Sequence, residues 1–417
     1  MRFRLAPTAA QETALLEHCS HARFVWNLAV EQHLYWRPGR ASAPGYREQC
    51  RQLTEARSES AWLRSGSQTV QQQALRDFSQ ATSNFFNGTH RRPTWRKRGR
   101  HEGFRIVGQR GNQWDVRRVS RKVGQVWVPK VGWVPFRWSR PIPVDAKSYR
   151  ITQDRSGRWH VAFAVIPEAI NRPTTDEAVG IDRGVAVSAA LSTGELLSAP
   201  GLSRKEAKRL KRLQRKLARA QRGSNRRTRI KFAIARLKAR ETDRRKDWAE
   251  KISTELARRF SLVGVEDLKI KNMVRSARGT VDEPGRNVRA KAGLNRSIHA
   301  AGWGLLVTRL EQKAPGRVTK VDPAFTSQIC NACGHRAAKN RESQAIFRCR
   351  ACGHTDHADV NAARNIRDIA VGRTVTARGG IGNAQPANRE PQPVPPLISR
   401  GNGLKSCAPP GAGGRQR

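Results

Sequence analysis

Two short cysteine motifs constrain this chain more than any other feature of its sequence. Cys330 and Cys333 enclose two residues, and Cys349 and Cys352 repeat that spacing after an interval of fifteen residues. Four thiolates so arranged can surround one zinc ion tetrahedrally, and the glycine after each pair permits a tight turn. A closed four-sulfur site has no position for substrate, so we predict structural zinc rather than a chance pairing of cysteines.

Histidines near these motifs are not needed as ligands, because four cysteines already complete the site. His335, His354 and His357 are expected to lie at the surface or to contact nucleic acid. The chain has seven cysteines and no secretory signal at its N-terminus. An odd cysteine count without such a signal favours a reducing cytoplasm, where paired cysteines hold metal more often than they form disulfides.

The charge of the chain indicates a polyanionic partner. There are 80 Lys and Arg residues against 33 Asp and Glu, a formal net charge of +47. Self-repulsion of this size opposes compaction unless a polyanion neutralises it, which excludes an ordinary enzyme of small metabolites. No run of about 18 apolar residues is present to span a bilayer. Nucleic acid is therefore the predicted partner, and a membrane is not.

Hydrophobic periodicity divides the first half of the chain. Residues 1–5 have the pattern of a short strand, and Pro7 and Thr8 mark a helix start. Apolar residues recur at helical spacing up to about residue 90. Between 91 and 175 the pattern alternates, as in antiparallel strands of a small barrel or sheet. Tryptophans among arginines suit stacking on bases, but filling the barrel core explains most of them better.

The second half alternates strands and helices and predicts a mixed sheet. Ser203 and Glu206 have the spacing of a capping box, and Gly223 interrupts a densely basic helical region. Like charges on successive turns destabilise a free helix, so this face is expected to lie along phosphates. The predicted elements are strands in 178–200, two helices in 203–260, a strand over 261–266, a mobile basic loop over 270–293, a helix over 295–313, a strand over 317–321, a helix over 361–371 and disorder over 373–417.

Three acidic residues occupy positions where carboxylates are costly. Asp182 and Glu266 each end an apolar strand, and Asp359 lies just before a helix. A buried acid is unfavourable unless something compensates it. Carboxylates gathered at strand ends can hold two divalent ions about 4 Å apart for phosphodiester hydrolysis, and Mg²⁺ suits such oxygen ligands. For one acid alone, pairing with an arginine or capping a helix would be the better interpretation.

Several segments, in this order, resemble a known family. GIDRGV, GVEDLKIKNM, LNRSIHAAGWG, DPAFTSQICNACG and CRACGHTDHADVNAARNI are similar to the RuvC-like nuclease domain of TnpB proteins, the transposon-encoded relatives of type V CRISPR effectors. RFRLAPTAAQ, HARFVWNLAV, VQQQALRDFSQATSNFFNG and PTWRKRG also match that family. The resemblance extends from about residue 1 to residue 372.

The resemblance implies an α/β multidomain fold. Its nuclease domain would be RNase H-like, with catalytic, Mg²⁺-binding Asp182, Glu266 and Asp359 and an inserted zinc ribbon. The implied divisions are a wedge-like β-barrel over 1–8 and 91–175, a helical recognition domain over 9–90, a RuvC-like domain over 176–325 and 358–372, a zinc ribbon over 326–357 and a disordered tail over 373–417.

The resemblance also implies a function. Family members carry a guide RNA made from the transposon end and cut double-stranded target DNA beside a short adjacent motif. Candidate nucleic-acid contacts are Gln72, Gln73 and Arg76 on one helix and Arg96, Lys97 and Arg98 in a basic loop. The family often has Asp-Arg-Asp where this chain has His357, Ala358 and Asp359, so one local contact is lost and Asp356 is a reserve candidate.

Other functions remain open at this level. Intact acids disfavour a nuclease-inactive, RNA-guided DNA-binding repressor, which otherwise fits the same resemblance. A transposase that joins DNA ends would share the acids, but no isolated catalytic tyrosine or serine motif is evident. A basic RNA chaperone would show no metal dependence. The sequence carries no signal for an oligomeric state.

Overall fold

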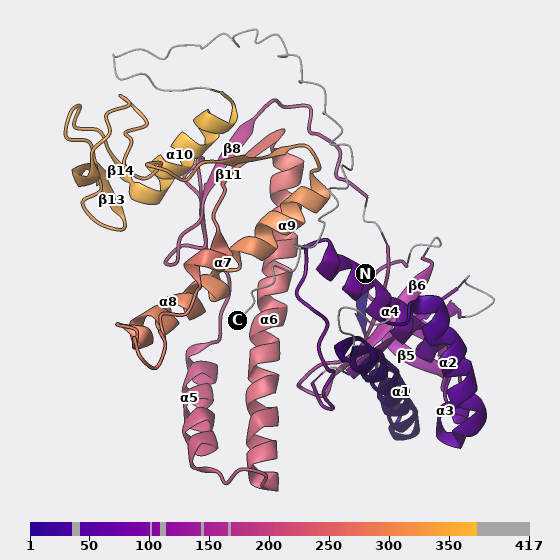
Figure 1. Ribbon diagram of the computed structural model, residues 1–417. Helices are drawn as coiled ribbons and strands as arrows, with labels where there is room; N and C mark the ends of the chain where they lie inside the picture. Colours follow the sequence, from indigo (N-terminus) through magenta and orange to yellow (C-terminus); the bar gives the residue numbers. More distant parts are fainter. Residues whose placement is uncertain (36–41, 101, 109–113, 143–145, 166–167, 373–417) are drawn as a thin grey trace, which may run out of the picture.

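The computed structural model describes residues 1–35, 42–100, 102–108, 114–142, 146–165 and 168–372. The predicted disordered tail over 373–417 lies outside these residues. The predicted α/β multidomain class is confirmed, with antiparallel sheets and helices in the first half and a mixed sheet with helices in the second (Figure 1). In the described part of the chain, no helix is both long enough and apolar enough to cross a membrane.

The strands of the first half form two antiparallel sheets. Alternating burial along β2 places every second side chain in the core, as the period of two predicts. An isolated bridge between Leu5 and Phe136 joins the sheets, while closure into a barrel stays a prediction. One sheet has the order β1 (Arg2–Arg4), β7 (Trp159–Phe163), β6 (Ser148–Gln153), β2 (Glu102–Val107), and the other β3 (Val116–Arg118), β4 (Val123–Val128), β5 (Gly132–Arg137).

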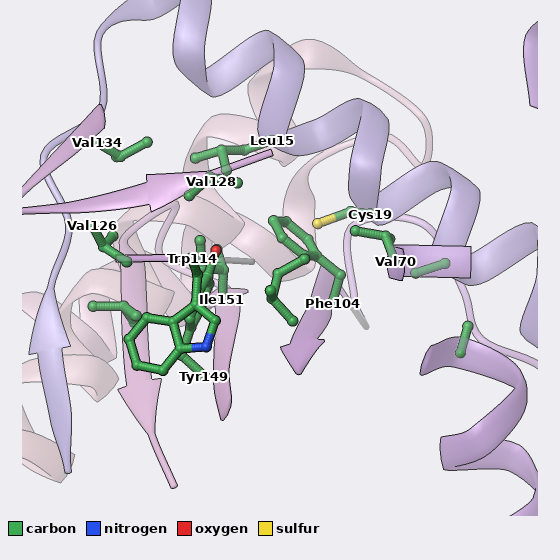
Figure 2. Packing of buried hydrophobic residues seen from close by; sticks show 14 of the residues in the cluster. Leu15, Cys19, Val70, Phe104, Trp114, Val126, Val128, Val134, Tyr149 and Ile151 are labelled. Atoms are coloured by element: carbon green, nitrogen blue, oxygen red, sulfur yellow. The ribbon is translucent and has the colours of Figure 1, made fainter. Parts of the chain in front are cut away.

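Of the four helices in this half, α1 and α4 pack against β2, α2 packs on α4, and α3 packs on α2. Thr8 caps α1 in a capping box with Gln11, so the predicted helix start is confirmed. One hydrophobic cluster joins helix and sheet and includes Leu15 and Val70 from the helices together with Trp114 and Tyr149 (Figure 2). The helices are α1 (Ala9–Leu34), α2 (Tyr46–Glu59), α3 (Ala61–Ser65) and α4 (Gln68–Phe86). Of the four tryptophans that are buried among the described residues, Trp26, Trp114 and Trp159 belong to this core, as expected.

The second half is built on a five-stranded mixed sheet. β8, β11 and β12 are parallel, and β9 pairs antiparallel with β8. Helix α10 (Ala358–Ala370) crosses the sheet closely, because Gly180 has no side chain: a Cβ there would lie 1.9 Å from the carbonyl oxygen of Ala363. The sheet order is β10 (Leu196–Leu197), β9 (Ala189–Leu191), β8 (Ala178–Asp182), β11 (Leu262–Glu266), β12 (Val318–Val321).

Between β10 and β11 the chain forms a long helical hairpin. α5 (Arg204–Arg219) and α6 (Asn225–Arg259) run side by side away from the sheet (Figure 1). Ser203 caps α5 in the predicted capping box, and Ser224 caps α6 after the predicted break. The C-terminal end of α6 is buried against the sheet, whereas its N-terminal half is mostly exposed.

The segment after β11 differs from the prediction. The expected loop over 270–293 contains α7 (Ile270–Met273) and the first turns of α8 (Val288–Ala301). The expected single helix to residue 313 is broken, because Gly302 adopts a left-handed φ of 74° and α9 (Trp303–Lys313) starts anew. The cysteine region contains η1 (Ala338–Asn340), β13 (Ile346–Arg348) and β14 (Thr355–His357).

Candidate functional site

The three predicted acids come together at one end of the mixed sheet. β8 and β11 run parallel with Ile181 opposite Val265, so Asp182 and Glu266, the next residue of each strand, leave the sheet side by side. Asp359 arrives from the first turn of α10, whose N-cap is His357. Glu266 and Asp359 are both 8% exposed. The carboxyl ends of parallel strands are the usual ligand position in open α/β sheets.

Burial and mutual repulsion make this cluster receptive to cations. Burial, together with the nearby carboxylates of Glu266 and Asp359, raises the pKa of Asp182 to about 7. Burial also raises the pKa of Glu266, although its hydrogen bonds oppose the shift. Carboxylates that share a site cannot all ionise without a compensating positive charge. The donor set, oxygens only, is the kind that Mg²⁺ prefers.

Two residues that the sequence analysis missed contact these carboxylates. The Thr326 hydroxyl donates to Oε1 of Glu266 at 3.0 Å, and Nη2 of Arg341 donates to Oδ1 of Asp359 at 2.7 Å. Thr326 is 2% exposed and Arg341 is half-buried. Both belong to the segment that carries the cysteines. Neither lies in a pattern with a chemical meaning of its own, so only the tertiary structure assigns them to the site.

The reserve candidate Asp356 is engaged elsewhere. Its Oδ2 accepts from Nη1 of Arg364 at 2.6 Å, and its Oδ1 accepts from the backbone N–H of His357 at 2.7 Å. Its position on β14, opposite Phe347, is set by the strand pairing of the cysteine region. Asp359 is therefore the acid of this segment that shares the cluster.

The four cysteines form a second cluster. Their sulfur atoms all lie within 4.8 Å of one another, with 3.8 Å between Cys330 and Cys352 and 3.6 Å between Cys333 and Cys349. Zn–S bonds of about 2.3 Å would place the sulfurs of a tetrahedral site about 3.8 Å apart. Among the described residues, these cysteines are the one group of three or more His, Cys, Asp or Glu side chains with the spacing of an ion site.

The environment of the sulfurs is uneven. Burial raises the pKa of Cys349, but backbone N–H groups of Cys352 and Ala351 outweigh it and lower that pKa to about 7. Burial raises the pKa of Cys330 to about 12. The three nearby histidines lie outside the sulfur group, as expected.

Amide side chains join the cysteine region to α10. Asn361 accepts from the backbone N–H of Asn331 at 3.0 Å and donates to the carbonyl of Ile329 at 2.8 Å. Asn365 donates to the carbonyls of Thr326 and Ile329 at 2.9 and 2.8 Å. These bonds orient the backbone from Thr326 to Asn331, and so connect the sulfur cluster to the carboxylate that Thr326 contacts.

The predicted nucleic-acid contacts differ in accessibility. Arg76 is exposed and lies over the ring of Tyr46, whereas Gln72 and Gln73 are half-buried on α4. Lys97 and Arg98 are exposed. Arg96 is stacked 3.7 Å from the ring centroid of Trp26, and burial lowers its pKa to about 10. Arg96 therefore anchors the basic loop to α1 and is less available to phosphate than its neighbours.

The α5–α6 hairpin presents the densest unpaired positive charge. Many of its side chains are exposed and form no ion pair within the described residues. Glu206, the acid at the start of α5, is already paired with Arg244 at 2.6 Å. On α5, in the turn after it and on the N-terminal half of α6, these cations are Arg204, Lys205, Lys208, Arg209, Lys211, Arg212, Arg215, Lys216, Arg219, Arg222, Arg226, Arg229, Lys231 and Arg236.

Three family models match the chain. One described as "Probable transposase" matches residues 151–277, one described as "Cas12f1-like, TNB domain" matches 303–366, and one described as a helix-turn-helix domain matches 1–37. The second spans both the cysteine motifs and Asp359. The third covers β1 and α1, which form a strand and one continuous helix.

Relatives match over nearly the whole length. "Putative RNA-guided DNA endonuclease InsQ" of Escherichia coli (strain K12) is 37% identical over 94% of this chain and 96% of the relative. "Putative RNA-guided DNA endonuclease" of Streptomyces pristinaespiralis is 32% identical over 91% and 90%. A Cas12f1–sgRNA–target DNA complex has a chain of similar fold, with a TM-score of 0.52, 16% identity and coverage of 86% of this chain and 82% of that one.

Proposed function

The chain belongs to the TnpB family of proteins related to RNA-guided DNA endonucleases, and from this we propose that it cuts double-stranded DNA at sites chosen by a bound guide RNA. The observation that carries the proposal is the meeting of Asp182, Glu266 and Asp359 at the end of the mixed sheet, in a chain so similar to named endonucleases.

The carboxylate cluster is the proposed catalytic site of a RuvC-like, RNase H-like domain over 176–325 and 358–372. Asp182, Glu266 and Asp359 would hold two Mg²⁺ ions, which supply charge stabilisation to the attacking and leaving oxygens of the phosphodiester. Thr326 orients Glu266, and Arg341 neutralises Asp359 until it is needed as a ligand. The chain's own contribution would thus be a buried set of oxygen ligands at one end of the mixed sheet.

The cysteine cluster is the proposed zinc ribbon over 326–357. Cys330, Cys333, Cys349 and Cys352 would hold one zinc ion in a closed, structural site, which their sulfur spacing fits. Zinc supplies folding energy there, since the ribbon has a core of only a few buried residues.

Guide RNA and target DNA would bind the first half and the basic hairpin. Residues 1–8 and 91–175 are the proposed wedge, residues 9–90 the proposed recognition domain, and Gln72, Gln73 and Arg76 the candidates for reading the adjacent DNA motif. Exposed, unpaired cations on α5 and α6 suit phosphate backbones, and their contacts should weaken steeply with salt. A guide made from the transposon end and action in the cytoplasm complete the proposal.

The test starts from the RNA that accompanies the protein. The chain is expressed with its flanking DNA and purified at moderate salt, and the co-purifying RNA is sequenced. One discrete RNA that ends beyond the element boundary is expected, and with it Mg²⁺-dependent cleavage of a matching duplex. A heterogeneous mixture of cellular RNA would contradict the proposal that the protein carries a guide RNA.

The same preparation separates the repressor alternative. Asp182→Ala should abolish cleavage while target binding persists. A wild-type protein that binds the matched target tightly but cuts nothing at any Mg²⁺ concentration would favour a nuclease-inactive, RNA-guided DNA-binding repressor. Cleavage that survives Asp182→Ala would contradict the assignment of the acids.

A further inference from the structure

A partly open cavity of about 250 Å³ is lined by residues of α6, α7, α8 and α9. Its wall is tied to the catalytic loop, because the indole N–H of Trp303 donates to the carbonyl of Gly184 at 3.0 Å. Gly184 follows Asp182 by two residues, and a Cβ on it would lie 3.7 Å from Oδ2 of Asp359. The helix break at Gly302 therefore places Trp303 next to the loop that follows Asp182.

The lining of the cavity has an apolar and a cationic part. Ile270, Ile298 and Leu305 supply aliphatic surface. Arg245, Lys246 and His299 line the same space and supply nitrogen donors.

These cations are poorly satisfied by the protein itself. Nε of Arg245 is buried and has no hydrogen-bond partner, and the carboxylate paired with its guanidinium, Glu241, is 3.8 Å away. Lys246 is exposed and forms no ion pair within the described residues. Donors left unpaired beside an apolar wall are unfavourable in the free protein, so the arrangement favours a ligand that brings acceptors.

We propose that this cavity holds one nucleobase of the cleaved strand, taken out of its stack, with the adjoining phosphate on Arg245 and Lys246. The inference rests on the proposed nuclease function and adds a subsite to it. A nucleotide combines a flat, largely apolar body with an anionic edge, which matches both parts of the lining. Sites for larger organic ligands span about 300–1,000 Å³, so this smaller space suits a single base.

A base held here has a mechanistic consequence. Taking a base out of its stack costs free energy, and this cost is least for a strand that is already single-stranded. Anchoring one nucleotide against the wall that Trp303 ties to Gly184 would fix the neighbouring phosphodiester near the three acids. The subsite would therefore position the strand and favour DNA that is already unpaired by the guide.

Gly304 offers a way to fill the cavity without disturbing the fold. It is the second residue of α9, and a Cβ on it would meet only Cδ1 of Ile270, at an ordinary 3.7 Å. Gly304→Leu should therefore occupy the space while raising the helix propensity of α9. Lys251→Ala is the matched control, because Lys251 is an exposed cation on the same helix as Lys246 and does not line the cavity.

The measurement uses guide-loaded Asp182→Ala protein and target DNA with 2-aminopurine placed at successive nucleotides around the mapped cut. Binding should raise the fluorescence several-fold at one position, as the base leaves its stack. Gly304→Leu, and Arg245→Ala combined with Lys246→Ala, should remove that rise, while Lys251→Ala should keep it. In proteins with Asp182 intact, the same changes should slow cleavage at least tenfold.

Measured affinity for the target DNA distinguishes failure of the base subsite from failure of the proposed nuclease function. Equal fluorescence at every position in a complex that still binds its target would overturn the subsite and leave the nuclease intact. So would an undiminished signal in Gly304→Leu. Failure of the guide-loaded protein to bind target at all would instead contradict the proposed function.

Discussion

The sulfur cluster and the carboxylate cluster are both proposed metal sites, yet the chain assembles them in opposite ways. All four cysteines come from one segment of the sequence, between residues 330 and 352, and their sulfur atoms lie within 4.8 Å of one another. The three acids come from β8, β11 and α10, and only the packing of α10 on the sheet brings them together.

The difference shows how the first cluster supports the second. The segment that carries the cysteines reaches two of the three acids, Glu266 through Thr326 and Asp359 through Arg341. We therefore expect the sulfur cluster, whose residues are close in sequence, to hold the three acids in position. Without that support, repulsion among the buried carboxylates would loosen the carboxylate cluster. Variants in the carboxylate cluster should therefore affect cleavage directly, whereas variants in the sulfur cluster should affect it through loss of zinc.

Asp182→Asn should have the largest effect. It removes a ligand charge from the open cluster, so cleavage should fall by at least about a thousandfold, equivalent to roughly 4 kcal/mol of transition-state stabilisation. Target binding should persist, measured by gel shift with the guide RNA. Asp267→Asn, a neutralisation at the half-buried residue next to Glu266, is the control and should cleave normally. Equal losses in both variants would mean that overall charge, not this cluster, matters.

Cys330→Ser should act on the carboxylates indirectly. Loss of zinc should unfold the ribbon locally and release both Thr326 and Arg341, lowering cleavage by roughly a hundredfold, the upper range for supporting residues of metal sites. Zinc content by mass spectrometry should drop, while guide RNA binding remains. Cys50→Ser, in α2 and away from both clusters, should retain zinc. Full activity in a zinc-free protein would break the proposed support of one cluster by the other.

Thr326→Val tests a single link between the clusters. Without the hydroxyl, Glu266 loses one orienting hydrogen bond, so the Mg²⁺ concentration for half-maximal cleavage should rise about tenfold. Mg²⁺-dependent thermal stabilisation of the protein should shift by the same factor, which loss of packing alone would not cause. Thr326→Ser should restore both values, because it keeps the donor. Identical Mg²⁺ responses in valine and serine variants would remove Thr326 from the site.

The last effect concerns the proton on Asp182. Asp182 ordinarily ionises near pH 3.8, but its pKa in the fold is about 7. Between these values the folded protein keeps a proton that the unfolded chain releases, so in chelator its stability should fall as pH rises from about 4 to 7. The slope attributable to Asp182 is at most about 1.4 kcal/mol per pH unit. The slope is measured as the difference in thermal stability between wild type and Asp182→Asn at each pH. A difference that does not change with pH would contradict the raised pKa of Asp182.

Excess Mg²⁺ should flatten the same curve, because a cation removes the advantage of the protonated acid. The sulfur cluster should show no matching response to Mg²⁺, since thiolates prefer softer ions. A parallel response of both clusters would show that they are not separate sites.

Local signals determined much of the structure from the sequence alone. The caps at Thr8 and Ser203, the break before α6, the apolar strands ending in Asp182 and Glu266, and the tight spacing of the cysteines all depend on neighbours within a few residues. Such features are stable against changes elsewhere in the chain, which is why their positions could be predicted. The helix break at Gly302 escaped prediction, because one glycine within an apolar pattern does not reveal its left-handed conformation.

Only the tertiary structure decided which side chains share a site. Thr326 and Arg341 are ordinary residues in the sequence and reach the acids because the amides of α10 orient the cysteine segment. Arg96 is stacked on Trp26, a contact that the sequence did not reveal, and its contact with nucleic acid stays a prediction. Contacts between residues distant in sequence depend on how helices and strands pack against one another. No local pattern along the chain specifies that packing.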